Sequence, residues 1–199
     1  VDDTRSMDAE QTKLAAAMAA LVEVLERPEV DANYRIAFTT TDAGNPLCGG
    51  SNPESGALRV DSCRGRLDAF GDGQACVTSC PEEWADLAIT PTTIDGDATP
   101  RPRPWIESVE GRTNLPAGLS VTQALQCASP QGLDGCEFEA PLESLWNALD
   151  RVSTEGDPAY GFVRASSILS VVHVTDGTEC SVDPEWEAIF LPDGGRTFW

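Results

Sequence analysis

The stretch Tyr34-Arg35-Ile36-Ala37-Phe38-Thr39-Thr40-Thr41 is the part of the sequence that decides the fold class. Its β-branched and aromatic residues predict a β-strand, and Asp42 and Gly44 predict the turn that ends it. Before it, residues 7–27 carry apolar side chains at the spacing of one helix face, and Pro28 ends that pattern. A helix followed after a short loop by such a strand predicts an α/β fold with a Rossmann-like, doubly wound and mostly parallel sheet.

The C-terminal half repeats these signals. Residues 167–175 predict a second buried strand that runs into Asp176 and Gly177, and the single histidine, His173, is expected to be a buried core residue within it. Helical periodicity returns at residues 120–127 and 137–152. The apolar residues on one face of the second of these helices are expected in the core: Phe138, Leu142, Leu145, Trp146 and Leu149.

Composition restricts the class of protein. The chain has 199 residues, 33 acidic and 13 basic side chains, and a formal net charge of -20. This length predicts a single domain, and 41% hydrophobic residues are enough to form a core. Such an acidic surface excludes nucleic acid and anionic membranes as partners, because both require clustered basic residues. No stretch is long and apolar enough for a transmembrane segment.

Seven cysteines beside a single histidine favour disulfide bonds, and therefore an exported protein in an oxidising compartment. A structural zinc knuckle is the minor alternative, because no Cys-x-x-Cys pair is present. Residues 43–117 are rich in Gly, Pro and Cys and predict a disulfide-stapled, loop-rich insertion. The spacings favour disulfides between cysteines close in the sequence: Cys48 with Cys63, Cys76 with Cys80, and Cys127 with Cys136. Cys180 then has no partner, and the actual connectivity stays open.

Two loops place oxygen-bearing side chains next to the predicted sheet. Asp2, Thr4 and Ser6 alternate just before the first helix, where Ser6 is also a fair N-cap, and Asp176 follows the second strand. Ligands of open α/β sheets bind where such loops meet, at the carboxyl ends of the strands. Carboxylate and hydroxyl oxygens suit a hard divalent cation such as Mg²⁺.

These motifs resemble those of von Willebrand factor A domains. Val1-Asp2-Asp3-Thr4-Arg5-Ser6-Met7 looks like the Asp-x-Ser-x-Ser loop of the family's metal-ion-dependent adhesion site (MIDAS), and residues 171–177 look like its later strand and Thr-Asp-Gly loop. The chain is most similar to exported bacterial members, often lipoproteins, that carry a cysteine-bearing insertion. The resemblance implies a non-enzymatic adhesion or binding domain, secreted or at the cell surface, with a lipid anchor before Val1. It also implies that Mg²⁺, Mn²⁺ or Ca²⁺ engages a carboxylate of a protein or other extracellular ligand.

Carried over residue by residue, the resemblance assigns Asp2, Thr4, Ser6 and Asp176 as metal ligands. It also places Leu119 where the family has a coordinating threonine, and leucine cannot bind a cation. Ser120 or Thr122 would then substitute after a small register change. The alternative is a metal-free interaction module of the same fold, and a third class is an acidic hydrolase that uses paired carboxylates.

The resemblance further implies that residues 1–199 are part of one such domain. In the family the first strand ends at Asp2 and lies in the centre of the sheet, so this chain lacks that strand and any strands after Trp199. We therefore expect an incomplete sheet, an open groove where the first strand belongs, and a partner for Cys180 outside the chain.

Overall fold

The structure is a computed structural model that describes residues 1–191. Its helical elements are η1 Arg5–Met7, α1 Asp8–Leu25, η2 Cys63–Phe70, α2 Ala75–Ser79, η3 Glu82–Trp84, α3 Val121–Ala128, α4 Pro141–Ser153 and η4 Pro184–Phe190. Its strands are β1 Tyr34–Ile36, β2 Thr92–Ile94, β3 Asp97–Arg101, β4 Ile106–Val109 and β5 Arg112–Thr113. The three helices predicted from periodicity all form, within a few residues of the predicted bounds.

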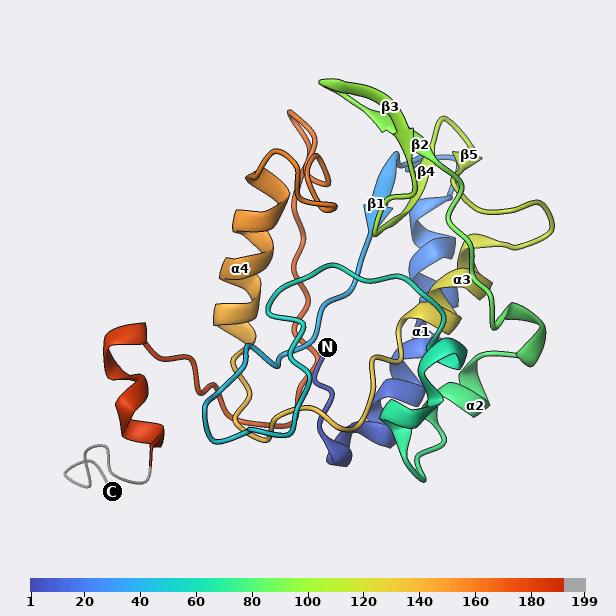
Figure 1. Cartoon of the computed structure of the whole chain (residues 1–199). Helices are drawn as coiled ribbons and strands as arrows, with labels where there is room; N and C mark the ends of the chain where they lie inside the picture. Colours follow the sequence, from blue (N-terminus) through green and yellow to red (C-terminus); the bar gives the residue numbers. More distant parts are fainter. Residues whose placement is uncertain (192–199) are drawn as a thin grey trace.

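One half of the molecule is a closed helical core, in which α1 packs against α2 and α3 (Figure 1). Met18 and Val22 of α1 meet Leu125 of α3, which is completely buried. Helix α3 begins in a capping box: Ser120 accepts a hydrogen bond from the Gln123 amide, and the Gln123 side chain accepts one from the Ser120 amide. The spacing of apolar residues and local capping thus account for the helices of this half of the molecule.

The sheets are small and antiparallel. Strand β1 pairs with β4 in the register Tyr34 to Ser108 and Ile36 to Ile106, β4 pairs with β5, and β2 and β3 form a separate hairpin. The mixed α and β content is as predicted, but the described residues do not form a mostly parallel, doubly wound sheet. Strand β1 pairs instead with β4, a strand of the insertion.

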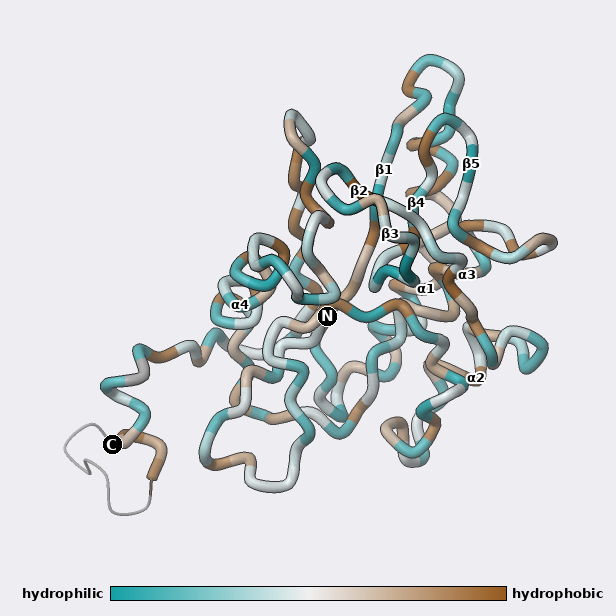
Figure 2. The backbone as a smooth tube through the Cα atoms, turned by 45° about the horizontal axis from the view of Figure 1, so that its top comes forward, coloured by the Kyte–Doolittle hydropathy of each residue, from teal (hydrophilic) through white to brown (hydrophobic). Residues whose placement is uncertain are grey.

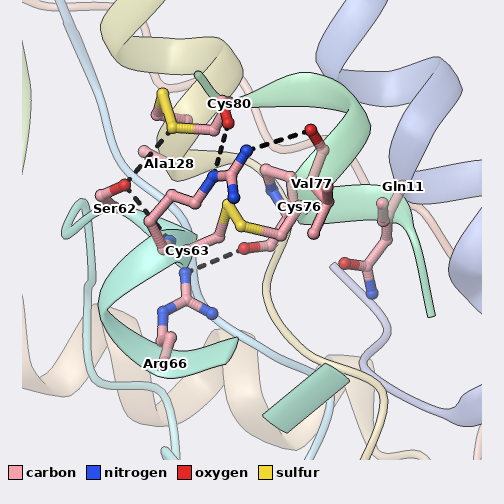
Figure 3. The surroundings of a disulfide bond; sticks show 12 residues. Gln11, Ser62, Cys63, Arg66, Cys76, Val77, Cys80 and Ala128 are labelled. Atoms are coloured by element: carbon pink, nitrogen blue, oxygen red, sulfur yellow. Dashed lines mark hydrogen bonds between the residues drawn. A yellow bond between two sulfur atoms is a disulfide. The ribbon is translucent and has the colours of Figure 1, made fainter. Parts of the chain in front are cut away.

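The described residues form three disulfides, two of which tie the insertion to the rest of the chain, and none is a predicted local staple. The bonds are Cys48–Cys136, Cys63–Cys76 and Cys80–Cys127, and Cys180 is free. The local pairings were wrong because packing brings α2 against both η2 and α3. Near the Cys63–Cys76 bond, Ser62 and Arg66 come from the N-cap and body of η2, and Gln11 comes from α1 (Figure 3).

The other half of the molecule is open. Residues 168–173 are extended but belong to no ladder, so the strand predicted at 167–175 does not form as a paired strand. His173 is exposed, contrary to the core position expected for it. On α4, Trp146 is 74% exposed and Leu142 is 57% exposed, so the predicted core face is only partly covered. These residues lack a layer to pack against.

A groove of about 160 Å³ lies between the two extended stretches and α4. Its walls are residues 37–41, residues 169–173 and the inner face of α4, including Ala148 and Val152. Val1 lies at the groove, and the N-terminus is in the middle of the molecule, between α4 and α1 (Figure 1). Figure 2 shows brown, apolar chain on both sides of this position.

Candidate metal centre

Asp2 is fully buried and is fixed on both its backbone and its side chain. Its amide donates to the Val174 carbonyl at 2.9 Å, and its own carbonyl accepts from Nε2 of Gln11, a buried residue of α1, at 2.8 Å. The Oδ1 atom accepts from the amide and the hydroxyl of Thr4 at 2.8 and 2.7 Å. The first predicted loop therefore holds its carboxylate in one orientation.

Hydrogen bonds through the hydroxyls of this first loop connect it to the second predicted loop. Thr4 Oγ1 lies 3.2 Å from Ser6 Oγ, and Ser6 Oγ donates to Asp176 Oδ1 at 3.0 Å. Ser6 is thus not the N-cap of α1, a position that Met7 occupies without a side-chain cap. The structure brings Asp2, Thr4, Ser6 and Asp176 together, although residues 6 and 176 are 170 positions apart.

A third carboxylate, Glu139, completes the cluster and was not predicted from the sequence. One ligand oxygen each from Asp2, Glu139 and Asp176 lies within 4.8 Å of the others. The Thr175 hydroxyl contacts both Asp2 Oδ2, at 2.9 Å, and Glu139 Oε2. The Glu139 carboxylate also lies so close to Gly177 that a Cβ there would overlap Oε1, which explains the glycine after Asp176.

The two buried carboxyls of the cluster have opposite pKa shifts. Burial, and then the hydrogen bond and charge of Asp2, raise the pKa of Glu139 to about 7. Burial also acts to raise the pKa of Asp2, but hydrogen bonds from Glu139, Thr4 and Thr175 outweigh it and leave this pKa below its ordinary value. Thr175 has a single hydroxyl hydrogen and can donate it to only one of the two carboxyls at a time, so the second contact is satisfied when Glu139 is protonated and donates to Thr175 Oγ1.

The donor set fits a hard divalent cation. It consists only of carboxylate and hydroxyl oxygens, which Mg²⁺, Mn²⁺ and Ca²⁺ prefer over nitrogen or sulfur ligands. Asp2 and Glu139 form its buried side, whereas Ser6 and Asp176 are exposed and leave the other side accessible. Such a site could hold a cation against the protein while a ligand reaches it from solvent.

The residues assigned to the middle loop do not join the cluster. Leu119 is buried in the helical core, where it packs with residues such as Val22. Ser120 uses its hydroxyl to cap α3, and no hydrogen bond between described residues links Ser120 or Thr122 to Asp2 or Asp176. Leucine at position 119 is therefore explained by packing. The alignment of this loop with the family's coordinating threonine has no support in the structure.

The sequence indicates only part of the position of Glu139, namely that this residue lies close to the start of a helix. Pro141 is the first residue of α4, a position that proline favours, so Glu139 lies in the loop just before a helix. Its place is fixed by the Cys180 amide, which donates to the Glu139 carbonyl at 2.7 Å. That contact crosses from one loop to another, so the spacing of residues does not reveal it.

No protein-family model matches the chain, and neither does any curated protein or solved structure. Among the described residues, no helix has the length and apolar character needed to cross a membrane.

Proposed function

We propose that this chain is a binding domain that engages its ligand through a divalent cation held by Asp2, Glu139 and Asp176. The observation that carries the proposal is the convergence of these three carboxylates, from loops far apart in the sequence, within 4.8 Å. Gathering like charges in a buried place is unfavourable, as the raised pKa of Glu139 indicates. A cation would remove this penalty by taking the place of the proton.

The side chains have different roles in this proposal. Asp2 and Glu139 would hold the cation from the buried side, and Thr4, Ser6 and Thr175 would orient the carboxylates by hydrogen bonds. The bound cation would supply positive charge at the surface near Asp176. The ligand would be a protein or other extracellular molecule that offers a carboxylate, which agrees with the resemblance to von Willebrand factor A domains at positions 2, 4, 6 and 176.

Three intramolecular disulfides support an oxidising, extracellular location for the domain. Attachment through a lipid anchor stays a prediction. A hydrolase would need a substrate to reach the paired carboxylates, but Asp2 and Glu139 are 0% and 3% exposed. We therefore favour binding over catalysis.

Calorimetric titration with Mg²⁺ and Mn²⁺ tests the proposal. The chain should bind either ion, and Asp176→Asn should weaken binding at least about tenfold. Asp86→Asn is the matched control, because Asp86 is an exposed carboxylate outside the cluster. Absence of binding, or equal affinities for the two variants, would contradict the cation site and favour the metal-free interaction module.

The pH dependence of the same titration gives a second readout. Because the Glu139 proton competes with the cation, affinity should rise as pH increases from about 5 to 8, with most of the change below the pKa of about 7. Glu139→Gln should weaken binding and flatten this dependence. An unchanged pH profile in that variant would exclude Glu139 as a ligand.

A further inference from the structure

A second pocket lies beside the C-terminal half of α4. Its volume is about 350 Å³, and its lining residues are all polar: Ser55, Asn147, Asp150, Arg151, Thr154 and Asp157. Glu139 of the carboxylate cluster lies just before the first residue of α4, whereas Asp150 lies in the last turn. About 14 Å of helix therefore separates the two places, and the pocket is a different site from the candidate metal centre.

Two loops form the walls of this pocket. The first contains Ser55 and Gly56, and a Cβ on Gly56 would overlap the backbone of α4, so this loop rests directly on the helix. The second is the turn after α4, where the Asp157 amide donates to the Thr154 carbonyl at 3.2 Å. The pocket is thus built on fixed backbone and is already formed, as ligand sites usually are.

Arg151 joins both walls and is already paired. Its Nε donates to the Ser55 carbonyl at 3.3 Å, and its Nη1 donates to Asp157 Oδ2 at 3.0 Å. Asp157 Oδ1 accepts from the Ala159 amide at 2.8 Å, so this ion pair is held in one orientation. Because Asp157 balances the charge of Arg151, Asp150 leaves the pocket with one net negative charge. An anionic ligand is therefore disfavoured.

The pocket also contains hydrogen-bonding groups that are not in use. Neither the Asn147 amide nor the Asp150 carboxylate has a partner among the described residues, and the same holds for Nη2 of Arg151. A carboxylate accepts hydrogen bonds, a guanidinium donates them, and an amide does both. A ligand that satisfies all three must therefore donate and accept at neighbouring atoms, as adjacent hydroxyl groups do.

An exposed aromatic ring lies beside the pocket. Trp146 is 74% exposed, directly precedes Asn147, and lies one helical turn before Asp150 on the same face of α4. No ring stacking or cation–π contact between described residues involves it. The face of an indole carries partial negative charge. It therefore attracts the C–H groups on one face of a sugar ring, which carry partial positive charge.

We propose that this pocket binds a neutral saccharide, with a sugar ring stacked on Trp146 and its hydroxyls bonded to Asn147, Asp150 and Arg151. Saccharides combine an apolar ring face with adjacent hydroxyls that both donate and accept. A cationic ligand would meet the guanidinium of Arg151, and a purely apolar ligand would find only polar lining residues. The volume of about 350 Å³ lies within the usual range of small-ligand sites. The site does not depend on the proposed cation.

NMR titration of the full chain in EDTA tests this proposal. The neutral probes are cellobiose, maltose and N,N′-diacetylchitobiose, and sialyllactose is the anionic comparison. A neutral probe should shift the indole N–H of Trp146 and the side-chain amide of Asn147, and sialyllactose should not. Trp146→Ser should weaken binding at least about tenfold. Asp150→Asn should weaken it less, because the amide keeps one acceptor oxygen.

Trp186→Ser is the matched control, because Trp186 is an exposed tryptophan of η4 outside the pocket, and it should leave the affinity unchanged. Urea unfolding checks that each variant is folded, and the exposure of Trp146 predicts that its replacement keeps the fold.

Three outcomes would overturn the proposal. If none of the three neutral probes shifts the Trp146 indole, the pocket does not take a saccharide. If choline shifts it and the neutral probes do not, the pocket belongs to a cationic ligand. If Trp146→Ser binds the neutral probe as tightly as the unmodified chain, the saccharide binds elsewhere on the protein. Because EDTA removes free cations, none of these results bears on the candidate metal centre, whose own test is the titration with Mg²⁺ and Mn²⁺.

Discussion

The helical core around α1, α2 and α3 and the open half around α4 differ in what covers their apolar side chains. In the core, Leu125 and Ala124 are completely buried, and disulfides hold the insertion against them. In the open half, Ile168 is 96% exposed and Val172 is 74% exposed, although both are as apolar as any core residue. An apolar sequence pattern therefore indicates which faces of an element can be buried. Whether such a face is buried depends on a neighbouring layer that packs against it.

The largest expected effect concerns the disulfide Cys80–Cys127, which joins α2 to the end of α3. Replacing both cysteines with serine should lower the free energy of unfolding by about 4 kcal/mol, because the bond closes a loop of 47 residues. Urea denaturation measures this change. Cys180→Ser is the control and should have little effect, since Cys180 forms no disulfide. If both changes lower the free energy of unfolding by the same amount, the stability of the core does not depend on the Cys80–Cys127 bond.

A second prediction concerns Asp3, a buried carboxyl close to Glu54 and Asp42. Burial, and then the charges of Glu54 and Asp42, raise the pKa of Asp3 to about 8. A group with a raised pKa in the folded state stabilises at pH values below its unfolded pKa of about 4, and this contribution is lost as pH rises to about 8. Asp3→Asn should therefore be more stable than the unmodified chain above pH 8, by on the order of 2 kcal/mol.

Thermal unfolding across this pH range checks the Asp3 prediction. The variant should lose the decline in stability between about pH 4 and 8 that Asp3 causes, and the two proteins should converge in acid. Parallel curves for the two proteins would show that Asp3 is not protonated at neutral pH.

The smallest effect is expected on α4. Trp146→Ser should change the free energy of unfolding by no more than about 0.5 kcal/mol, because this side chain is 74% exposed. Leu125→Ala in the core should cost about 3 kcal/mol by the same urea measurement. If the tryptophan change costs as much as the leucine change, α4 is covered in solution and the contrast between the halves is wrong.

The sequence predicted those features that depend on local spacing. Helices α1, α3 and α4 follow from apolar periodicity, with Pro28 after the first of them, although α4 begins at Pro141 and not at the predicted residue 137. The loops with Asp2 and Asp176 were recognised because each motif is contiguous and each follows or precedes a clear element. The placement of Thr4 and Ser6 beside them follows from the same short motif.

Features that depend on contacts between distant segments were not predicted. The disulfide partners, the pairing of β1 with β4, and the position of Glu139 each arise from packing across the insertion. The exposure of His173 has a similar cause. Its apolar neighbours indicate a buried strand, but no strand among the described residues pairs with residues 168–173.

The disulfide Cys48–Cys136 has a consequence for the order in which the molecule matures. Cys136 lies just before Glu139 in the sequence, so this bond anchors the loop that carries the third carboxylate. In a reducing compartment the loop would lose this covalent anchor and keep only hydrogen bonds, such as that from the Cys180 amide to the Glu139 carbonyl, so the three carboxylates would be held together less firmly. Under the proposed cation site, oxidation would then precede tight cation binding, so the reduced chain should bind Mg²⁺ more weakly than the oxidised one.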